Sequence, residues 1–86
     1  MFGGIQVAID SKIKSDNAIS LGSNIKKLRL KNSYSQAYMV REMQLLGCNT
    51  TKQNYSKYEK DLAHIHASEL VAIAKILGVN IESLFI

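Results

Sequence analysis

The stretch that decides the fold covers residues 35–59 and reads SQAYMVREMQLLGCNTTKQNYSKYE. Ser35 is a candidate N-cap, because its side-chain oxygen can accept hydrogen bonds from the free N–H groups of the next helical turn. Apolar residues then recur at the spacing of a half-buried helix, and Gly47 is the type of residue that ends one. The expected inward-facing residues of this helix are Met39, Val40, Met43 and Leu46.

A second helix is expected directly after the first, with Thr50 or Thr51 as its N-cap. It carries Tyr55, Tyr58 and Leu62, and the two tyrosines are expected to face the core. Two helices joined by a tight turn are the arrangement that places a helix in the DNA major groove. Lysine can donate to guanine O6 and N7, and glutamine can bond adenine N6 and N7. The outer face of this second helix would carry two lysines, a glutamine and a serine, namely Lys52, Gln53, Ser56 and Lys57.

Further helices are expected on both sides of this pair. Ser20 or Ser23 can cap a helix that ends near Asn32, another begins near Ala67–Ser68, and Asn80 can cap a final short one. Because helices of this length are not stable alone, they must pack on one another, which predicts an all-α fold of five short helices. Leu21, Ile25 and Leu28 share one face of the first of these helices, and Leu70, Ile73, Ala74 and Leu77 face inward from the second. The final short helix carries Ile81, Leu84 and Phe85.

Residues 1–20 follow a different pattern. Ile5, Val7 and Ile9 alternate with other residues, which is the period of a short strand. A lone strand has no partner inside this chain, so the segment would pair with a second subunit or remain loosely ordered. We therefore divide the chain into an N-terminal extension, residues 1–20, and a helical domain, residues 21–86.

The composition restricts the class of protein. With 86 residues, 47% of them hydrophobic and 21% charged, the chain has the make-up of one small globular domain. Residues 21–60 hold eight basic residues and two acidic ones, so a negatively charged partner is expected to meet this segment. The apolar runs are far shorter than the roughly 20 residues of a membrane span, and no secretory signal pattern is visible. A single cysteine, Cys48, excludes an intramolecular disulfide, and a cytoplasmic location is expected.

Four segments of the sequence resemble, in their order, the Cro/Xre type of phage-repressor helix-turn-helix regulators. The resemblance covers residues 21–85 and implies a five-helix, lambda-repressor-like domain that binds double-stranded DNA. The segments are LGSNIKKLRL (21–30), SQAYMVREM (35–43), NYSKYE (54–59) and LVAIAKILGVNIESLF (70–85).

The resemblance also implies roles for single residues. Gln36 would begin the second helix and contact a phosphate, and Arg29 and Glu59 match an ion pair that links the first helix to the end of the recognition helix. The residues expected at base edges are Lys52, Gln53 and Lys57. The residues expected at the phosphate backbone are Gln36, Thr51, Asn54 and Ser56.

Three positions depart from the family pattern. The stretch Gln44–Asn49 is longer than the usual turn, which predicts an extra turn on the preceding helix. Val40 stands where alanine is usual, and it demands slightly looser packing. Lys60 and Asp61 stand where a glycine usually follows Glu59, so the pattern does not define how the recognition helix ends.

The leading hypothesis is a sequence-specific, double-stranded DNA-binding transcriptional regulator with no enzymatic step and no cofactor. An antitoxin-like protein of the same fold, which binds both DNA and a protein partner, is the alternative. A third class would bind RNA or protein and never duplex DNA. An enzyme is the least supported class, because a domain of this length leaves little room for a pocket. Cys48, His64 and His66 do not have the number and spacing of ligands that a metal site needs, so no metal is expected.

The working form is expected to be a homodimer, because one small domain reads only a few base pairs and two-fold pairing doubles that reading. Two surfaces could make the contact, namely the C-terminal helix and the segment with Ile5, Val7 and Ile9. The C-terminal helix is favoured, because it carries more apolar side chains than it can bury in its own domain. These are Val79, Ile81, Leu84, Phe85 and Ile86.

Overall fold

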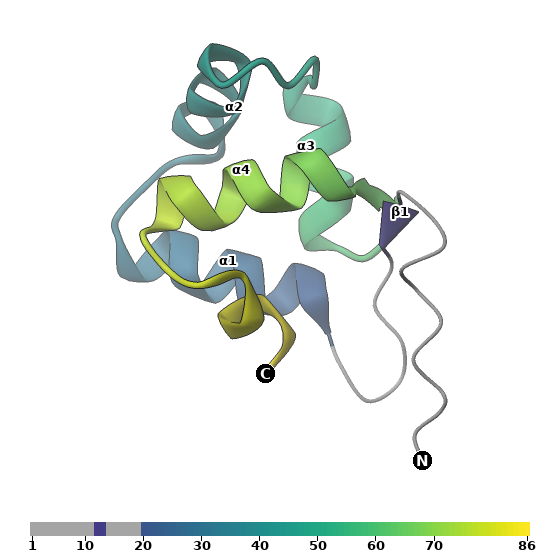
Figure 1. The fold of residues 1–86 in the computed structure, drawn as a ribbon. Coiled ribbons are helices and arrows are strands. Elements are labelled where there is room, and N and C mark those ends of the chain that lie inside the picture. Colours follow the sequence, from purple (N-terminus) through teal and green to yellow (C-terminus); the bar gives the residue numbers. More distant parts are fainter. Residues whose placement is uncertain (1–11, 14–19) are drawn as a thin grey trace.

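The structure is a computed structural model that describes residues 12–13 and 20–86. Four α-helices, a short strand pair and a 3-10 helix make up this part of the chain (Figure 1). The strand expected at Ile5, Val7 and Ile9 lies outside the described residues. The elements are β1 (Lys12–Ile13), α1 (Leu21–Lys31), α2 (Gln36–Leu45), α3 (Lys52–Glu59), β2 (Ile65–His66), α4 (Ala67–Leu77) and η2 (Ile81–Phe85).

The helices pack around one hydrophobic core. α4 lies between α1 and α2, and α3 packs against both α1 and α2 (Figure 1). Most of the residues expected to face inward are buried, so the helical periodicity identified the core faces of all four α-helices. The core residues are Leu21, Ile25, Met39, Val40, Met43, Tyr55, Tyr58, Ile65, Leu70, Ile73, Ala74, Leu77 and Leu84.

α2 and α3 begin at capping residues that the sequence predicted. Ser35 Oγ accepts a hydrogen bond from the backbone N–H of Tyr38 at 3.0 Å, and Thr51 Oγ1 accepts one from Asn54 at 3.1 Å. α4 ends at Gly78, whose φ of 70° lies in the left-handed region that favours glycine. Of the two candidate caps for α3, Thr51 is therefore the correct one.

Leu46 was wrongly expected in the core, and half of its surface is exposed. α2 ends at Leu45, and the backbone N–H of Leu46 bonds the carbonyl oxygens of Glu42 and Met43 as the helix closes. The chain then turns at Gly47, with φ of 93°, so residue 46 leaves the helical face before it reaches the core. Half-buried Cys48 packs against the core in this region instead.

Leu62 was wrongly expected on the helix that carries Tyr55 and Tyr58; it lies beyond the end of α3 and is 70% exposed. α3 ends at Glu59, and Asp61 adopts a left-handed backbone with φ of 58°, which reverses the chain. The N–H of Leu62 then bonds the carbonyl oxygen of Lys57 at 2.9 Å. Because the chain has turned back, Ile65 rather than Leu62 fills the core.

Asp61 also joins the end of α3 to the beginning of α1. Its Oδ1 accepts a hydrogen bond from the backbone N–H of Gly22, and its Oδ2 accepts one from the hydroxyl of Ser20, both at 2.9 Å. Ser20 is the N-cap of α1, but its side chain makes no capping hydrogen bond itself. A carboxylate from 41 residues downstream therefore supplies the negative charge that favours a helix N-terminus.

The fifth helix expected from Asn80 onward is a 3-10 helix of five residues, η2. Leu84 is fully buried in the core, Phe85 is half-buried and packs against the core, and Ile81 is exposed. Asn24 in α1 fixes the segment by donating from Nδ2 to the carbonyl oxygens of Leu84 at 2.9 Å and Ile86 at 2.7 Å.

A two-stranded antiparallel pair connects the N-terminal extension to the domain. Lys12 pairs with His66 and Ile13 with Ile65, so β2 lies directly before α4 and holds β1 beside it (Figure 1). No pattern in the sequence indicates a strand at residues 65–66. Part of the extension thus has a pairing partner inside its own chain.

Candidate nucleic-acid interface

α3 is held by its inner face, which leaves its outer face free. Tyr55 and Tyr58 on the inner face are fully buried, and their rings meet edge to face with centroids 6.3 Å apart. Both rings anchor the helix between α1 and α2. The side chains on the opposite face point into solvent from a fixed support.

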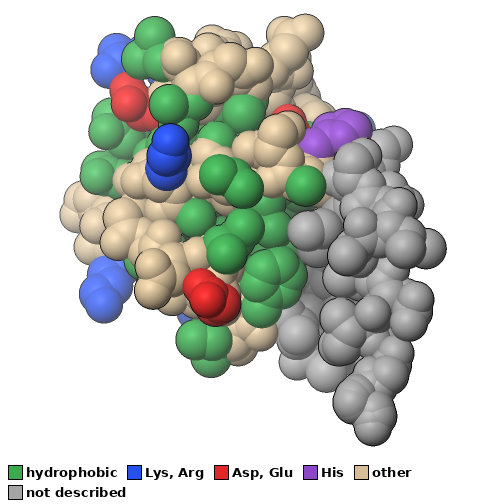
Figure 2. Space-filling model, viewed as in Figure 1, with side chains coloured by type: hydrophobic (Ala, Val, Ile, Leu, Met, Phe, Trp, Pro, Cys, Tyr) green, Lys and Arg blue, Asp and Glu red, His purple; other side chains and the backbone are tan. Residues whose placement is uncertain are grey.

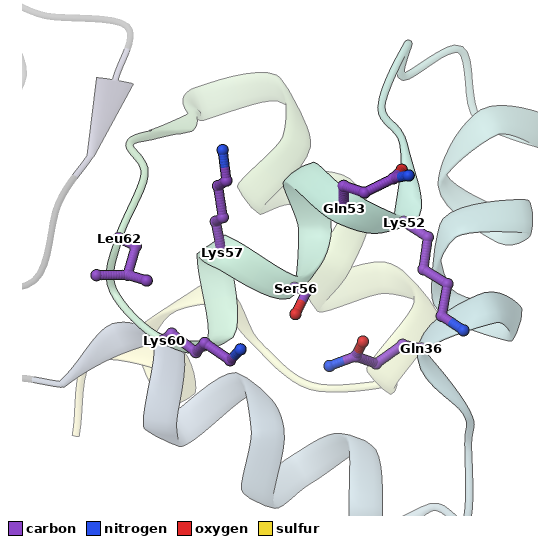
Figure 3. A pocket seen from close by; sticks show the side chains of 7 residues that line it. All are labelled: Gln36, Lys52, Gln53, Ser56, Lys57, Lys60 and Leu62. Atoms are coloured by element: carbon purple, nitrogen blue, oxygen red, sulfur yellow. The ribbon is translucent and has the colours of Figure 1, made fainter.

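The outer face of α3 forms a hollow of about 500 Å³ together with the first residue of α2 (Figure 3). The lysines of the hollow are exposed, and within the described part of the chain they take part in no ion pair. Among the residues that the structure describes, no acidic side chain lines it. The result is a positively charged surface with amide and hydroxyl groups at its centre. Its lining residues are Gln36, Lys52, Gln53, Ser56, Lys57, Lys60 and Leu62.

The structure brings together the three residues expected at base edges and two of the four expected at phosphates. Gln36 comes from α2 and points toward Ser56 at the middle of the hollow (Figure 3). Thr51 is exposed at the N-terminus of α3, where its Oγ1 caps the helix. Asn54 does not line the hollow, because its Nδ2 donates to the hydroxyl of Tyr58 at 2.8 Å, on the inner side of α3.

A buried ion pair supports the hollow from beneath. Arg29 Nε lies 2.6 Å from Glu59 Oε2, and Arg29 Nη2 lies 3.0 Å from Glu59 Oε1. The two side chains are only 9% and 2% exposed. Arg29 also donates from Nη1 to the carbonyl oxygen of Tyr34 at 2.9 Å. The bidentate contact fixes the end of α3 to α1 and to the connection before α2.

Two further donors complete the environment of Glu59. The hydroxyl of Tyr55 donates to Oε2 at 2.6 Å, and Gln36 Nε2 donates to Oε1 at 3.0 Å. Burial alone would raise the pKa of Glu59, but the hydrogen bonds from Arg29, Tyr55 and Gln36 outweigh it and hold this pKa below its usual range. The hydrogen bond to Glu59 raises the pKa of Arg29, so both members of the pair are charged.

A second buried carboxylate links α3 to α4. The hydroxyl of Tyr58 and the backbone N–H of His66 both donate to Glu69 Oε1, at 2.8 and 3.0 Å. Burial and the hydrogen bond to Glu69 raise the pKa of Tyr58 to about 12, so this hydroxyl remains a donor at neutral pH. α3 is thus fixed to the rest of the domain through both of its buried tyrosines.

Sequence reasoning missed three residues that shape this region. Lys60 lines the hollow, and it was recognised only as a departure from the family pattern. Asp61 and Glu69 anchor the two ends of the segment after α3, yet each makes its contacts through the tertiary fold, which no local pattern reveals. A basic residue directly after the recognition helix was the one available signal, for Lys60.

A metal site was not expected, and the described residues contain no group of three metal-ligating side chains. Burial raises the pKa of the Cys48 thiol, which is half-buried against the core. Within the described ranges, no helix has the length and hydropathy to cross a membrane.

Comparison with known protein families gives one match. The model of a family described as helix-turn-helix matches residues 25–84, which includes all of α2, α3 and α4. Comparisons with curated proteins and with solved structures found no match.

Proposed function

Since the chain belongs to the Cro/Xre type of the helix-turn-helix family, whose members bind double-stranded DNA, we propose that it is a sequence-specific transcriptional regulator that inserts α3 into the major groove. The observation that carries this proposal is the division of α3 into two faces. Tyr55 and Tyr58 fix the inner face, and the outer face presents exposed lysines and a glutamine around an open hollow. This is the form in which a helix is presented to a groove.

The outer face supplies both parts of a DNA interaction. Lysines that contact phosphates release counterions and provide most of the binding free energy, whereas hydrogen bonds to base edges provide the discrimination. Lys52, Gln53 and Lys57 are the proposed base readers. Lys60, at the end of α3, is proposed as an additional phosphate contact, and the same role is kept for Thr51 and Ser56.

Selection of bound duplexes from a random pool tests this proposal. In low salt, the protein should retain duplexes and enrich one short sequence, and retention should fall steeply as salt is added. A protein that enriches no sequence, or that prefers single strands over every duplex, would contradict the proposal. A variant with Lys52, Gln53 and Lys57 all changed to Ala provides the control, because it alters the outer face of α3 and leaves the core unchanged.

We further propose that the protein acts as a homodimer through its C-terminal segment. Hydrophobic side chains gather over α4 and the segment after it, and charged side chains on this face are few (Figure 2). Leu84 belongs to the core, but Ile81 is exposed and Ile86 is 90% exposed, and Val79 and Phe85 are half-buried. Sedimentation at micromolar concentration, free and with the enriched duplex, tests the dimer. A chain that is monomeric in both conditions would contradict it.

The antitoxin-like alternative shares the DNA-binding face and needs a second surface for a protein. Leu45 and Leu46 at the end of α2 are exposed outside the hollow, and they favour such a surface. Loss of a protein partner in a Leu45→Ser, Leu46→Ser variant with unchanged DNA binding would support this alternative.

A further inference from the structure

The side-chain amide of Gln36 lies between a buried carboxylate and the open surface of α3. Its Nε2 donates to Glu59 Oε1 at 3.0 Å. From there the side chain lines the hollow next to Ser56, with Lys52 and Lys60 on either side (Figure 3). Gln36 is therefore the one side chain of the hollow that also contacts the ion pair beneath it, among the residues that the structure describes.

The charge of Glu59 determines which way this amide faces. An ionised carboxylate has only acceptor atoms, so the NH₂ end of Gln36 must face it and the carbonyl Oε1 must face away. Glu59 stays ionised, because Arg29 contacts both of its oxygens. A reversed amide would place Gln36 Oε1 against Glu59 Oε1 and leave two acceptors in contact in a part-buried position, which is costly.

The fixed amide leaves a definite pattern of free groups. One N–H of Nε2 is used by Glu59, so one N–H and the acceptor Oε1 remain, and no described residue donates to Oε1. A phosphate oxygen accepts hydrogen bonds and offers nothing to a carbonyl oxygen. An adenine edge in the major groove offers the N6 amino group as a donor and N7 as an acceptor, which matches both free groups of the amide.

We propose that Gln36 reads an adenine in the major groove, and that Glu59 is the positioning residue that fixes the direction of its amide. The inference rests on the proposed DNA-binding function and replaces the phosphate contact that the family resemblance implies for Gln36. α2 thus adds a fourth side chain to the sequence reading that the family resemblance gives to α3 alone.

Selection from the random duplex pool, repeated with a Gln36→Ala variant, is the first test. The wild-type protein should enrich an adenine at one position of each half-site where the variant enriches no base, and the other positions should be the same for both. Lys60→Ala is the matched control from the same hollow. It should weaken binding to all duplexes and leave every preference unchanged, because a phosphate contact carries no sequence information.

The second test replaces the adenine at that position by 7-deazaadenine, which lacks the N7 acceptor. The wild-type protein should bind this duplex about tenfold more weakly than the natural one, equivalent to about 1.4 kcal/mol. The Gln36→Ala variant should bind both duplexes equally, because the contact is already lost.

The outcomes separate this inference from the proposed function. A wild-type protein that enriches no sequence overturns both. A Gln36→Ala variant that keeps the wild-type preferences and loses affinity for all duplexes equally overturns the inference alone. So does a tenfold loss on the 7-deazaadenine duplex that persists in the variant.

Discussion

The guanidinium of Arg29 and the carboxylate of Glu59 meet across 30 residues of sequence in a bidentate contact, with nitrogen–oxygen distances of 2.6 and 3.0 Å. This contact connects α1 to the last residue of α3, directly beneath the surface that we propose to meet DNA. The pair is almost fully shielded from solvent. Removing the ion pair is therefore expected to act mainly on the stability of the domain, and only indirectly on the contacts with DNA.

Replacing either partner of this pair should destabilise the domain strongly. Glu59→Ala leaves the Arg29 charge buried without a partner, and we expect a loss of about 3–5 kcal/mol in the free energy of unfolding. Arg41→Ala is the matched control, because it removes an arginine from an ion pair at the surface. The Arg41 side chain is 72% exposed, and its Nη2 lies 3.8 Å from Glu42 Oε2. Its expected cost is below about 1 kcal/mol. Urea denaturation at one fixed protein concentration measures both values, and equal losses would contradict the account.

Because of the same ion pair, the free energy of unfolding should fall as the solution becomes acidic. The pKa of Glu59 is lower in the folded chain than its ordinary value of 4.5, so its ionised form stabilises the fold above that pH. This contribution should disappear as the pH falls below about 4.5 toward the folded-state pKa. A Glu59→Gln variant, although less stable, should lose less further stability than the wild-type protein over this pH range. Parallel curves for the two proteins would show that Glu59 does not cause the effect.

Gly22→Ala tests the close approach of α1 to the end of α3. A methyl group at this position would collide with the carbonyl oxygen of Tyr58 and lie 2.8 Å from Asp61 Oδ1. Alanine is otherwise the better helix former by about 1 kcal/mol. We expect the collision to dominate and to destabilise the domain by about 1–3 kcal/mol. Ser23→Ala, one residue further along α1, should change little, and a stabilised Gly22→Ala variant would refute the close contact.

Gln53→Ala should change the preferred DNA sequence rather than weaken all binding. Gln53 lies on the exposed face of α3, and its side chain makes no hydrogen bond to any described residue. A lost base contact is worth about 1–3 kcal/mol of discrimination at one position. Competition binding with duplexes that differ at single positions measures this. An equal loss on every duplex would show that Gln53 does not read bases.

Local patterns in the sequence correctly predicted those features that depend only on residues close together in the chain. Ser35 and Thr51 cap their helices as predicted, because capping involves only the next turn. The periodicity of α4 identified its core face for the same reason. The pairing of Arg29 with Glu59 followed only from the family resemblance, since its partners are distant in sequence.

Local patterns failed where a helix ends and the chain reverses. Leu46 and Leu62 continue the apolar stripes of α2 and α3, and both are exposed because the chain turns at Gly47 and Asp61 first. The pairing of β1 with β2 and the contact of Asp61 with Gly22 join distant segments, and no periodicity predicts them. In the candidate site, the direction of the Gln36 amide depends on Glu59 and was not accessible from the sequence.

The central claim is that the outer face of α3 meets the DNA, and amide chemical-shift mapping tests it most directly. ¹⁵N–¹H spectra of the wild-type protein would be recorded during titration with the duplex enriched by selection. The account predicts that the largest shifts occur at Gln36 and at residues 51–60. Unchanged signals at residues 51–60, with shifts confined to α4, would contradict it.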